Sequence, residues 1–129
     1  MGGKEAPGPG IRKVNLEETF GRFSDHWVPR VVGALNGQLV KVAKVQGAFD
    51  WHRHPGEDEL FLVVRGRLDL HFRDGIVTLD PGDFCIVPRG VEHRPEAADE
   101  TWIVLFEPEG TLNTGDRRTA RTVDTLETI

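Results

Sequence analysis

The chain has 129 residues, a length that suits a single folded domain. Its formal net charge of -5, with no run of lysine or arginine, argues against nucleic acid as a partner. No apolar run approaches membrane-spanning length, which argues against a membrane partner. The single cysteine, Cys85, excludes an internal disulfide and favours the reducing cytoplasm.

The first predicted element is a short helix near the N-terminus. Residues 1–13 are rich in glycine and proline and are expected to form a disordered tail, which leaves residues 14–129 as one domain. Asn15 can cap a helix, with Glu18 three positions on as the other half of a capping box. Apolar residues then recur at helical spacing, at Leu16, Phe20 and Phe23. The helix should end near residues 21–24.

From residue 27 onward the sequence predicts strands and turns. Short apolar or alternating segments are separated by turn signals such as Asn36-Gly37 and Asp74-Gly75. The segments expected to be extended are 27–29, 30–35, 38–45, 60–64, 68–72, 76–79, 84–87, a strand that contains His93, and 102–106. Residues 97–100 are polar and separate the last two strands, and residues 109–129 show no clear pattern. Many short strands at regular spacing indicate an all-β barrel or sandwich.

Three of the five histidines lie in two short segments about forty residues apart. His52 and His54 are two positions apart, and on a strand such side chains point to the same side. Glu59 and His93 are the candidates that complete a set of three imidazoles and one carboxylate. Such a set suits a divalent transition metal (iron, manganese, nickel, cobalt or zinc) and leaves about two octahedral positions open. The plainer alternative is that these histidines only pack or form hydrogen bonds.

Three neighbouring acids compete for the carboxylate position. Glu59 is preferred because it faces the same way as Phe61 and Val63, whereas Glu57 and Asp58 are expected to lie in a solvated loop. Glu59 is also the candidate catalytic base, if it can leave the metal.

The two segments resemble the paired motifs of the cupin superfamily. The first motif, a glycine, a His-x-His pair, a glutamate and a second glycine, is matched by Gly47, His52, His54, Glu59 and Gly66. The second is matched by Gly82, Pro88, Gly90 and His93, with Ala97 where the family usually has asparagine. More narrowly, the chain resembles the small cupins labelled mannose-6-phosphate isomerase-like, in segments 25–29, 51–54, 58–61 and 107–115.

The resemblance covers residues 39–108 and implies a cupin-type jelly-roll β-barrel with a metal near its centre, commonly in a homodimer. It implies no particular substrate. Phe61, Phe84 and Trp102 are the candidates to line a substrate pocket around the metal. The apolar segment 26–32 is a candidate to cover a sheet edge, either its own or that of a second copy.

Two function classes remain open on the sequence. The leading hypothesis is a metal-dependent cupin enzyme that acts on a small polar or oxygenated molecule by isomerase, cyclase, lyase or dioxygenase chemistry. The alternative is a non-catalytic cupin that binds a metal or a small ligand. A third class, an interaction protein with a vestigial site, is disfavoured because all four ligand positions are intact.

Overall fold

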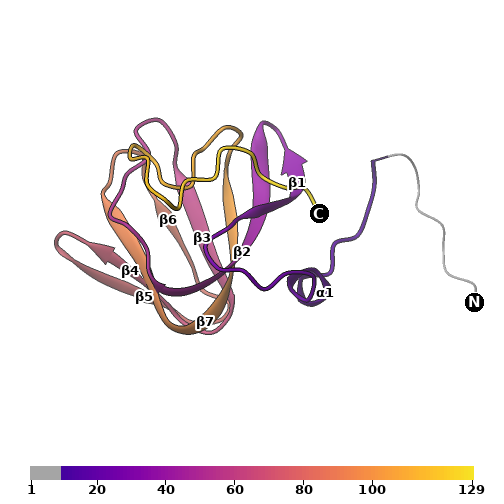
Figure 1. Cartoon of the computed structure of the whole chain (residues 1–129), viewed down its shortest axis with the longest axis horizontal. Coiled ribbons are helices and arrows are strands. Elements are labelled where there is room, and N and C mark those ends of the chain that lie inside the picture. The colour runs from indigo at the N-terminus through magenta and orange to yellow at the C-terminus, as the bar shows by residue number, and fades with distance from the viewer. Residues whose placement is uncertain (1–9) are drawn as a thin grey trace, which may run out of the picture.

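The computed structural model describes residues 10–129 and shows an all-β barrel, as predicted. One short helix precedes seven strands: α1 (Leu16–Phe20), β1 (Arg30–Leu35), β2 (Gln38–Ala48), β3 (Glu59–Arg65), β4 (Leu68–Phe72), β5 (Gly75–Leu79), β6 (Phe84–Val87) and β7 (His93–Pro108). The strands curve around a closed interior, and α1 lies against the outside (Figure 1). The predicted jelly roll with a short N-terminal helix is confirmed.

β7 is the strand that joins the sheet together. The order β1-β2-β7-β3-β6 places it at the centre, and it also pairs with β4, which in turn pairs with β5. It is a single strand of 16 residues, whereas the sequence predicted a polar break at residues 97–100. Residues 98–100 instead form an exposed bulge, because the pairing with β2 shifts between Val45 and Gly47.

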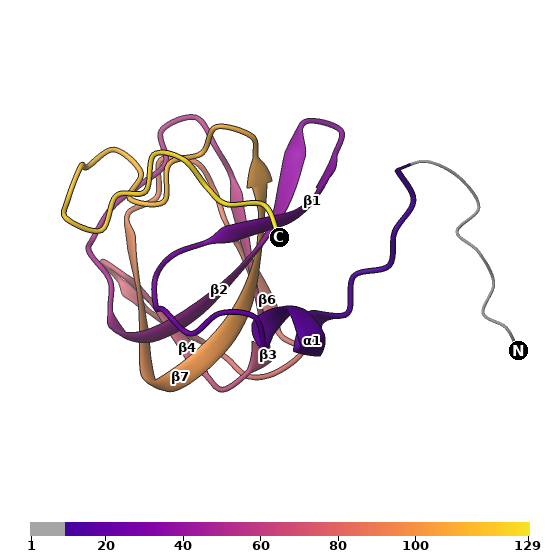
Figure 2. The same cartoon turned by 45° about the vertical axis from the view of Figure 1, so that its right-hand side comes forward.

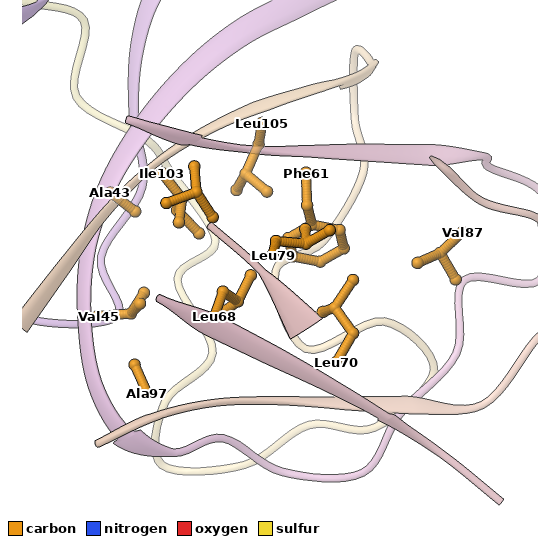
Figure 3. Packing of buried hydrophobic residues seen from close by; sticks show 11 residues of the cluster. Ala43, Val45, Phe61, Leu68, Leu70, Leu79, Val87, Ala97, Ile103 and Leu105 are labelled. Carbon is orange, nitrogen blue, oxygen red and sulfur yellow. The ribbon is translucent and has the colours of Figure 1, made fainter. Parts of the chain in front are cut away.

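Inward-facing apolar side chains from β2, β3, β4 and β7 fill the barrel. Figure 3 shows this inner core, whose members include Val45, Phe61, Leu68, Leu70, Ile103 and Leu105. A second cluster lies on the outer face, where Phe20 of α1 is fully buried against Val42 and Val104. Both faces of β2 and β7 are therefore covered, which explains why these strands are apolar at successive positions rather than at alternate ones.

The helix begins as the sequence predicts. The side chain of Asn15 accepts a hydrogen bond from the backbone N–H of Glu18 at 2.9 Å, which caps the first turn. The helix ends at Phe20, one turn short of Phe23. The extended conformation predicted for residues 27–29 is wrong at Trp27, whose φ of 65° lies in the left-handed region.

The C-terminal segment, which shows no clear pattern in the sequence, runs along one end of the barrel and finishes beside β1 (Figures 1 and 2). The backbone N–H of Val31 donates to the carbonyl of Glu127 at 2.9 Å, and that of Ile129 donates to the carbonyl of Val31 at 3.0 Å. Most of the predicted tail, residues 1–9, lies outside the described residues. Within residues 10–129, no helix is long and apolar enough to cross a membrane.

Candidate metal centre

The four residues that the sequence selected lie together inside the barrel. His52 and His54 belong to the segment before β3, Glu59 is the first residue of β3, and His93 is the first residue of β7. Each offers one ligand atom, and these atoms all lie within 4.8 Å of one another. None of the four residues is more than 4% exposed. The arrangement is compact enough for one ion to contact all four.

Backbone carbonyls orient two of the imidazole rings. The Nδ1 atom of His52 lies 2.8 Å from the carbonyl oxygen of Asp50, and that of His93 lies 3.0 Å from the carbonyl oxygen of Val91. A carbonyl oxygen only accepts, so each Nδ1 carries the hydrogen and each Nε2 keeps its lone pair. This tautomer is the one that binds a metal through Nε2.

Burial keeps His52 ready to bind. It lowers the pKa of His52 to about 4, and the nearby His93 and His54 act in the same direction. At neutral pH the ring is therefore uncharged, as a metal ligand must be.

Glu59 lies between two of the rings. Its Oε1 atom is 3.2 Å from the Nε2 atom of His54 and 3.4 Å from that of His93. Burial acts to raise the pKa of Glu59, but the adjacent side chains of Glu107, His54 and His93 outweigh it and hold that pKa well below its usual range. The carboxylate is therefore ionised and able to bind a cation.

The rival acids lie away from the centre. Asp58 is exposed and accepts a hydrogen bond from the backbone N–H of Arg89 at 2.8 Å. Glu57 lies in the same loop, before β3 begins. Neither belongs to the cluster of ligand atoms in the described chain.

Several polar atoms of the cluster lack a protein partner. Among residues 10–129, both ring nitrogens of His54, Oε1 of Glu59 and Nε2 of His93 are buried without a hydrogen bond. Buried polar atoms are seldom left in this state, because losing water without a substitute is costly. A divalent cation would satisfy one ring nitrogen of His54, Oε1 of Glu59 and Nε2 of His93. A set of three nitrogens and one oxygen is what first-row transition metals prefer. The residues therefore fit such an ion.

A small cavity of about 40 Å³ lies beside the cluster, enough for roughly three water molecules. Its polar walls come from His52, Glu59, Glu107 and Asn113. Its apolar walls come from Trp27, Pro29, Ala43, Val45, Phe49, Phe61, Pro95, Ile103 and Leu105. Phe61 thus lies where the sequence placed it, with its ring centroid 5.9 Å from that of His93.

The other two predicted pocket residues lie elsewhere, and strand parity explains why. Phe61 pairs with Cys85 of β6, so Cys85 shares its face and Phe84 points outward, with 60% of its surface exposed. On β7 the inward residues include Ile103 and Leu105, so Trp102 points outward. There it stacks on Phe20 of α1 with 4.8 Å between ring centroids.

The sequence missed a buried ion pair beside the cavity. The Nζ atom of Lys41 lies 2.9 Å from Oε1 of Glu107, and both side chains are at most 2% exposed. Burial raises the pKa of Glu107 well above its usual range, the adjacent Glu59 adds to this, and Lys41 opposes it. Counting by twos from Ile103 along β7 would have placed Glu107 on the inner face.

A C-terminal loop closes over the ligand segment. The backbone N–H of Asp116 donates to the carbonyl of Arg53 at 2.9 Å, and the backbone N–H of Arg53 donates to the Asp116 carboxylate at 3.1 Å. Gly115 has a φ of +61° and packs directly on the Arg53 carbonyl and the His52 ring, leaving no room for a Cβ. The segment that looked featureless in sequence thus holds the His-x-His pair in place.

Comparisons with known proteins agree with this geometry. Residues 38–107 match the Cupin_2 family, whose description is "Cupin domain". The uncharacterised protein YdbB of Bacillus subtilis (strain 168) is 38% identical over 64 residues, which span 49% of this chain and 57% of YdbB. The chain therefore matches little more than half the length of that curated relative.

Two solved structures resemble the barrel. A cupin-2 domain containing protein from Shewanella frigidimarina is 42% identical, with a TM-score of 0.74 over 74% of this chain and 94% of that one. Protein NMB1881 from Neisseria meningitidis is 27% identical, with a TM-score of 0.70 over 76% of this chain and 100% of that one.

Proposed function

The chain belongs to the Cupin_2 family of cupin domains, and on that premise we propose that it is a metal-dependent enzyme that acts on a small polar or oxygenated molecule. One observation carries the proposal: four buried side chains bring their ligand atoms within 4.8 Å of one another. They are His52, His54, Glu59 and His93. These residues would hold one divalent ion of iron, manganese, nickel, cobalt or zinc.

In this proposal the metal ion and the side chains have different roles in the reaction. A bound metal of this kind supplies Lewis-acid polarisation of a substrate oxygen, for isomerase, cyclase or lyase chemistry, or activation of dioxygen for a dioxygenase. The chain supplies orientation, because backbone carbonyls fix the rings of His52 and His93. Glu59 balances the positive charge and is the candidate base that takes a proton from the substrate.

The apolar wall has its own part in this proposal. Phe61, Ile103 and Leu105 line the cavity and keep bulk water from the reacting group. With room for roughly three water molecules, the cavity admits a group of a few atoms while the rest of a larger substrate stays outside.

The same small volume favours a second candidate, a non-catalytic cupin that binds a metal or a small ligand. A binder needs space only for the ligand, whereas an enzyme must also admit and release product. The experiment that separates the two is turnover by the metal-loaded protein against a panel of small hydroxy and oxo acids and sugars. Metal-dependent turnover that disappears after chelation supports the enzyme, and tight binding without turnover supports the binder.

Assembly and location are parts of the same proposal. Phe84 and Ile86, which are 60% and 54% exposed, lie on the outer face of β6 at the edge of the sheet, and a homodimer would cover them. A mannose-6-phosphate isomerase-like subtype rests on the sequence segments described above. A cytoplasmic location rests on the single cysteine, which leaves the chain without an internal disulfide.

A further inference from the structure

We propose that Glu107 contacts the ligand in the cavity, and that this ligand therefore carries a hydroxyl group beside the oxygen that reaches the metal centre. The inference rests on the proposed function, because it assigns a second polar contact to the same cavity. It narrows the substrate class to small hydroxylated molecules. Lys41 is assigned as the positioning residue for Glu107.

The strand register places Glu107 beside the metal ligands. Leu60 of β3 pairs with Phe106 of β7, so Glu59 and Glu107 follow as neighbours on the inner face of the sheet. Glu107 is 2% exposed and lines the cavity together with Glu59 and His52. A ligand held at the metal centre would therefore lie against this carboxyl group.

One oxygen of Glu107 is left for a ligand. Oε1 is held by the ammonium group of Lys41 at 2.9 Å, and that group also approaches the carbonyl of Thr111 at 3.5 Å. Lys41 does not line the cavity, so it holds the carboxyl group of Glu107 on the side away from the cavity. Oε2 is buried, and the described part of the chain offers it no hydrogen-bond donor.

Burying Lys41 and Glu107 with one oxygen left unpartnered costs folding free energy, which indicates that Glu107 has a role beyond stability. A buried ion pair generally stabilises a fold no more than well-packed apolar residues would. An unpartnered buried oxygen lowers the stability further, because it has lost its hydrogen bonds to water. The neighbours of Glu107 along the inner face, Ile103 and Leu105, show that apolar side chains pack well there. A ligand that hydrogen-bonds to Oε2 would offset the cost.

A hydroxyl is the group that matches this oxygen. It can both donate and accept, so it suits Oε2 whether or not the carboxyl group carries a proton. The surrounding wall is mostly apolar, which leaves few other polar contacts to orient a ligand. A buried polar group of this kind rejects an analogue that lacks the hydroxyl, because the oxygen is then left without a partner.

The competing role for Glu107 is purely structural: it could support Glu59 and touch no ligand. The two roles differ in what they do to ligand preference. Support of Glu59 would change metal affinity and would weaken all ligands equally. Contact with a hydroxyl would change the preference between ligands of equal size and charge at a fixed metal content.

The test uses the full chain loaded with Co²⁺, whose visible spectrum reports ligand binding, and two probes, glycolate and propionate. These probes have the same charge and nearly the same size, and differ by a hydroxyl in place of a methyl group. The variants are Glu107→Gln, which keeps the size but replaces the carboxyl group by an amide, and the double variant Lys41→Met with Glu107→Leu, which replaces both partners together. Glu109→Gln, an exposed glutamate two residues away, is the matched control.

We expect the wild type and Glu109→Gln to prefer glycolate equally. The double variant should lower this preference by about tenfold or more. Glu107→Gln should lower it by a smaller factor, because the amide still offers a polar group to a hydroxyl. An unchanged preference in Glu107→Gln and in the double variant overturns the role of Glu107, as does a Co²⁺-loaded wild type that does not prefer glycolate. Failure of the wild type to bind Co²⁺ overturns the proposed metal centre itself, a separate result read from metal content alone.

Discussion

His52 and His93 are joined through their backbones, and their rings lie close together. The N–H of His52 donates to the carbonyl of His93 at 3.1 Å, and the N–H of His93 donates to the carbonyl of His52 at 2.9 Å. This isolated bridge ties the two motif segments together without using either ring. The rings, with centroids 4.4 Å apart, are therefore positioned before any metal arrives.

Replacing His93 by alanine should remove the metal and keep the fold, because the backbone bridge does not need the ring. We expect metal affinity to fall by more than about 100-fold, since loss of a ligand exceeds the usual effect of losing a supporting residue. Metal analysis of the purified variant, together with its circular dichroism spectrum, measures both effects. His26→Ala is the control, since His26 pairs with Glu100 outside the cluster. Stoichiometric metal in His93→Ala would remove His93 from the site.

The stability of the metal-free protein should decrease in acid because of His52. The pKa of its ring is about 4 in the folded protein against 6.5 for the free side chain, so between these values the unfolded chain binds more protons. The contribution of His52 to the free energy of unfolding is therefore fully present above about pH 6.5. It is lost as the pH drops towards 4, which lowers the free energy of unfolding by up to about 3 kcal/mol.

Urea unfolding at several pH values in this range, with a chelator present, measures the effect. The variant His52→Gln cannot titrate at this position, so its stability should depend less on pH than that of the wild type. Parallel curves for the two proteins would show that His52 does not carry this dependence.

A methyl group at Gly115 should disturb the metal centre, whereas the same change at Gly110 should not. Both glycines have positive φ, so either substitution by alanine costs about 1 kcal/mol of stability. At Gly115 the new Cβ also collides with the Arg53 carbonyl and lies 3.0 Å from Cδ2 of His52, whereas at Gly110 it meets nothing within 4 Å.

We therefore expect Gly115→Ala to unfold at lower denaturant and to bind metal at least about tenfold more weakly. Gly110→Ala should lose stability while its metal affinity stays at the wild-type value. Denaturant unfolding and metal titration of the two variants provide the comparison. Equal metal affinity in both would separate the C-terminal loop from the site.

The outer face of β6 provides the test of assembly. If Phe84 and Ile86 lie in a dimer interface, replacing both by serine should give a monomer, because the buried apolar area that drives association is lost. Light scattering at micromolar concentration measures the mass. Ile76→Ser is the control, since this residue is 59% exposed but lies on β5, away from that edge. A wild type that is already monomeric would reject the proposed dimer.

The sequence was sufficient to select the four residues of the candidate metal centre for two physical reasons. The His-x-His spacing follows from the two-residue period of an extended chain, which His52 and His54 illustrate. The resemblance to cupins then supplied Glu59 and His93. These two residues are far apart in the sequence, so the local periodicity of a strand could not predict that they meet.

The sequence could not show which residues of β7 point into the barrel and which point outward. Residues 102–106 are apolar at every position because α1 covers the outer face of β7 while the barrel core covers the inner face. Trp102 and Ile103 therefore look equally suited to a core, and only the pairing register separates them. Glu107 was missed for a related reason: its partner, Lys41, is 66 residues away and lies on another strand.

The central position of β7 has a consequence for the order in which this protein is made. Three antiparallel pairs, β1 with β2, β3 with β6, and β4 with β5, are complete in the chain before β7 begins. Among the strands of residues 10–129, each pair is connected to the others only by its pairing with β7. During synthesis from the N-terminus these pairs emerge with unpaired edges, which are the surfaces most prone to aggregate. His93 is the first residue of β7, so a nascent chain gains the last of its four candidate ligands just as it gains the strand that closes the barrel. A ribosome that pauses shortly before this point would hold a chain that lacks one of the four candidate ligands and whose strand edges are still unpaired.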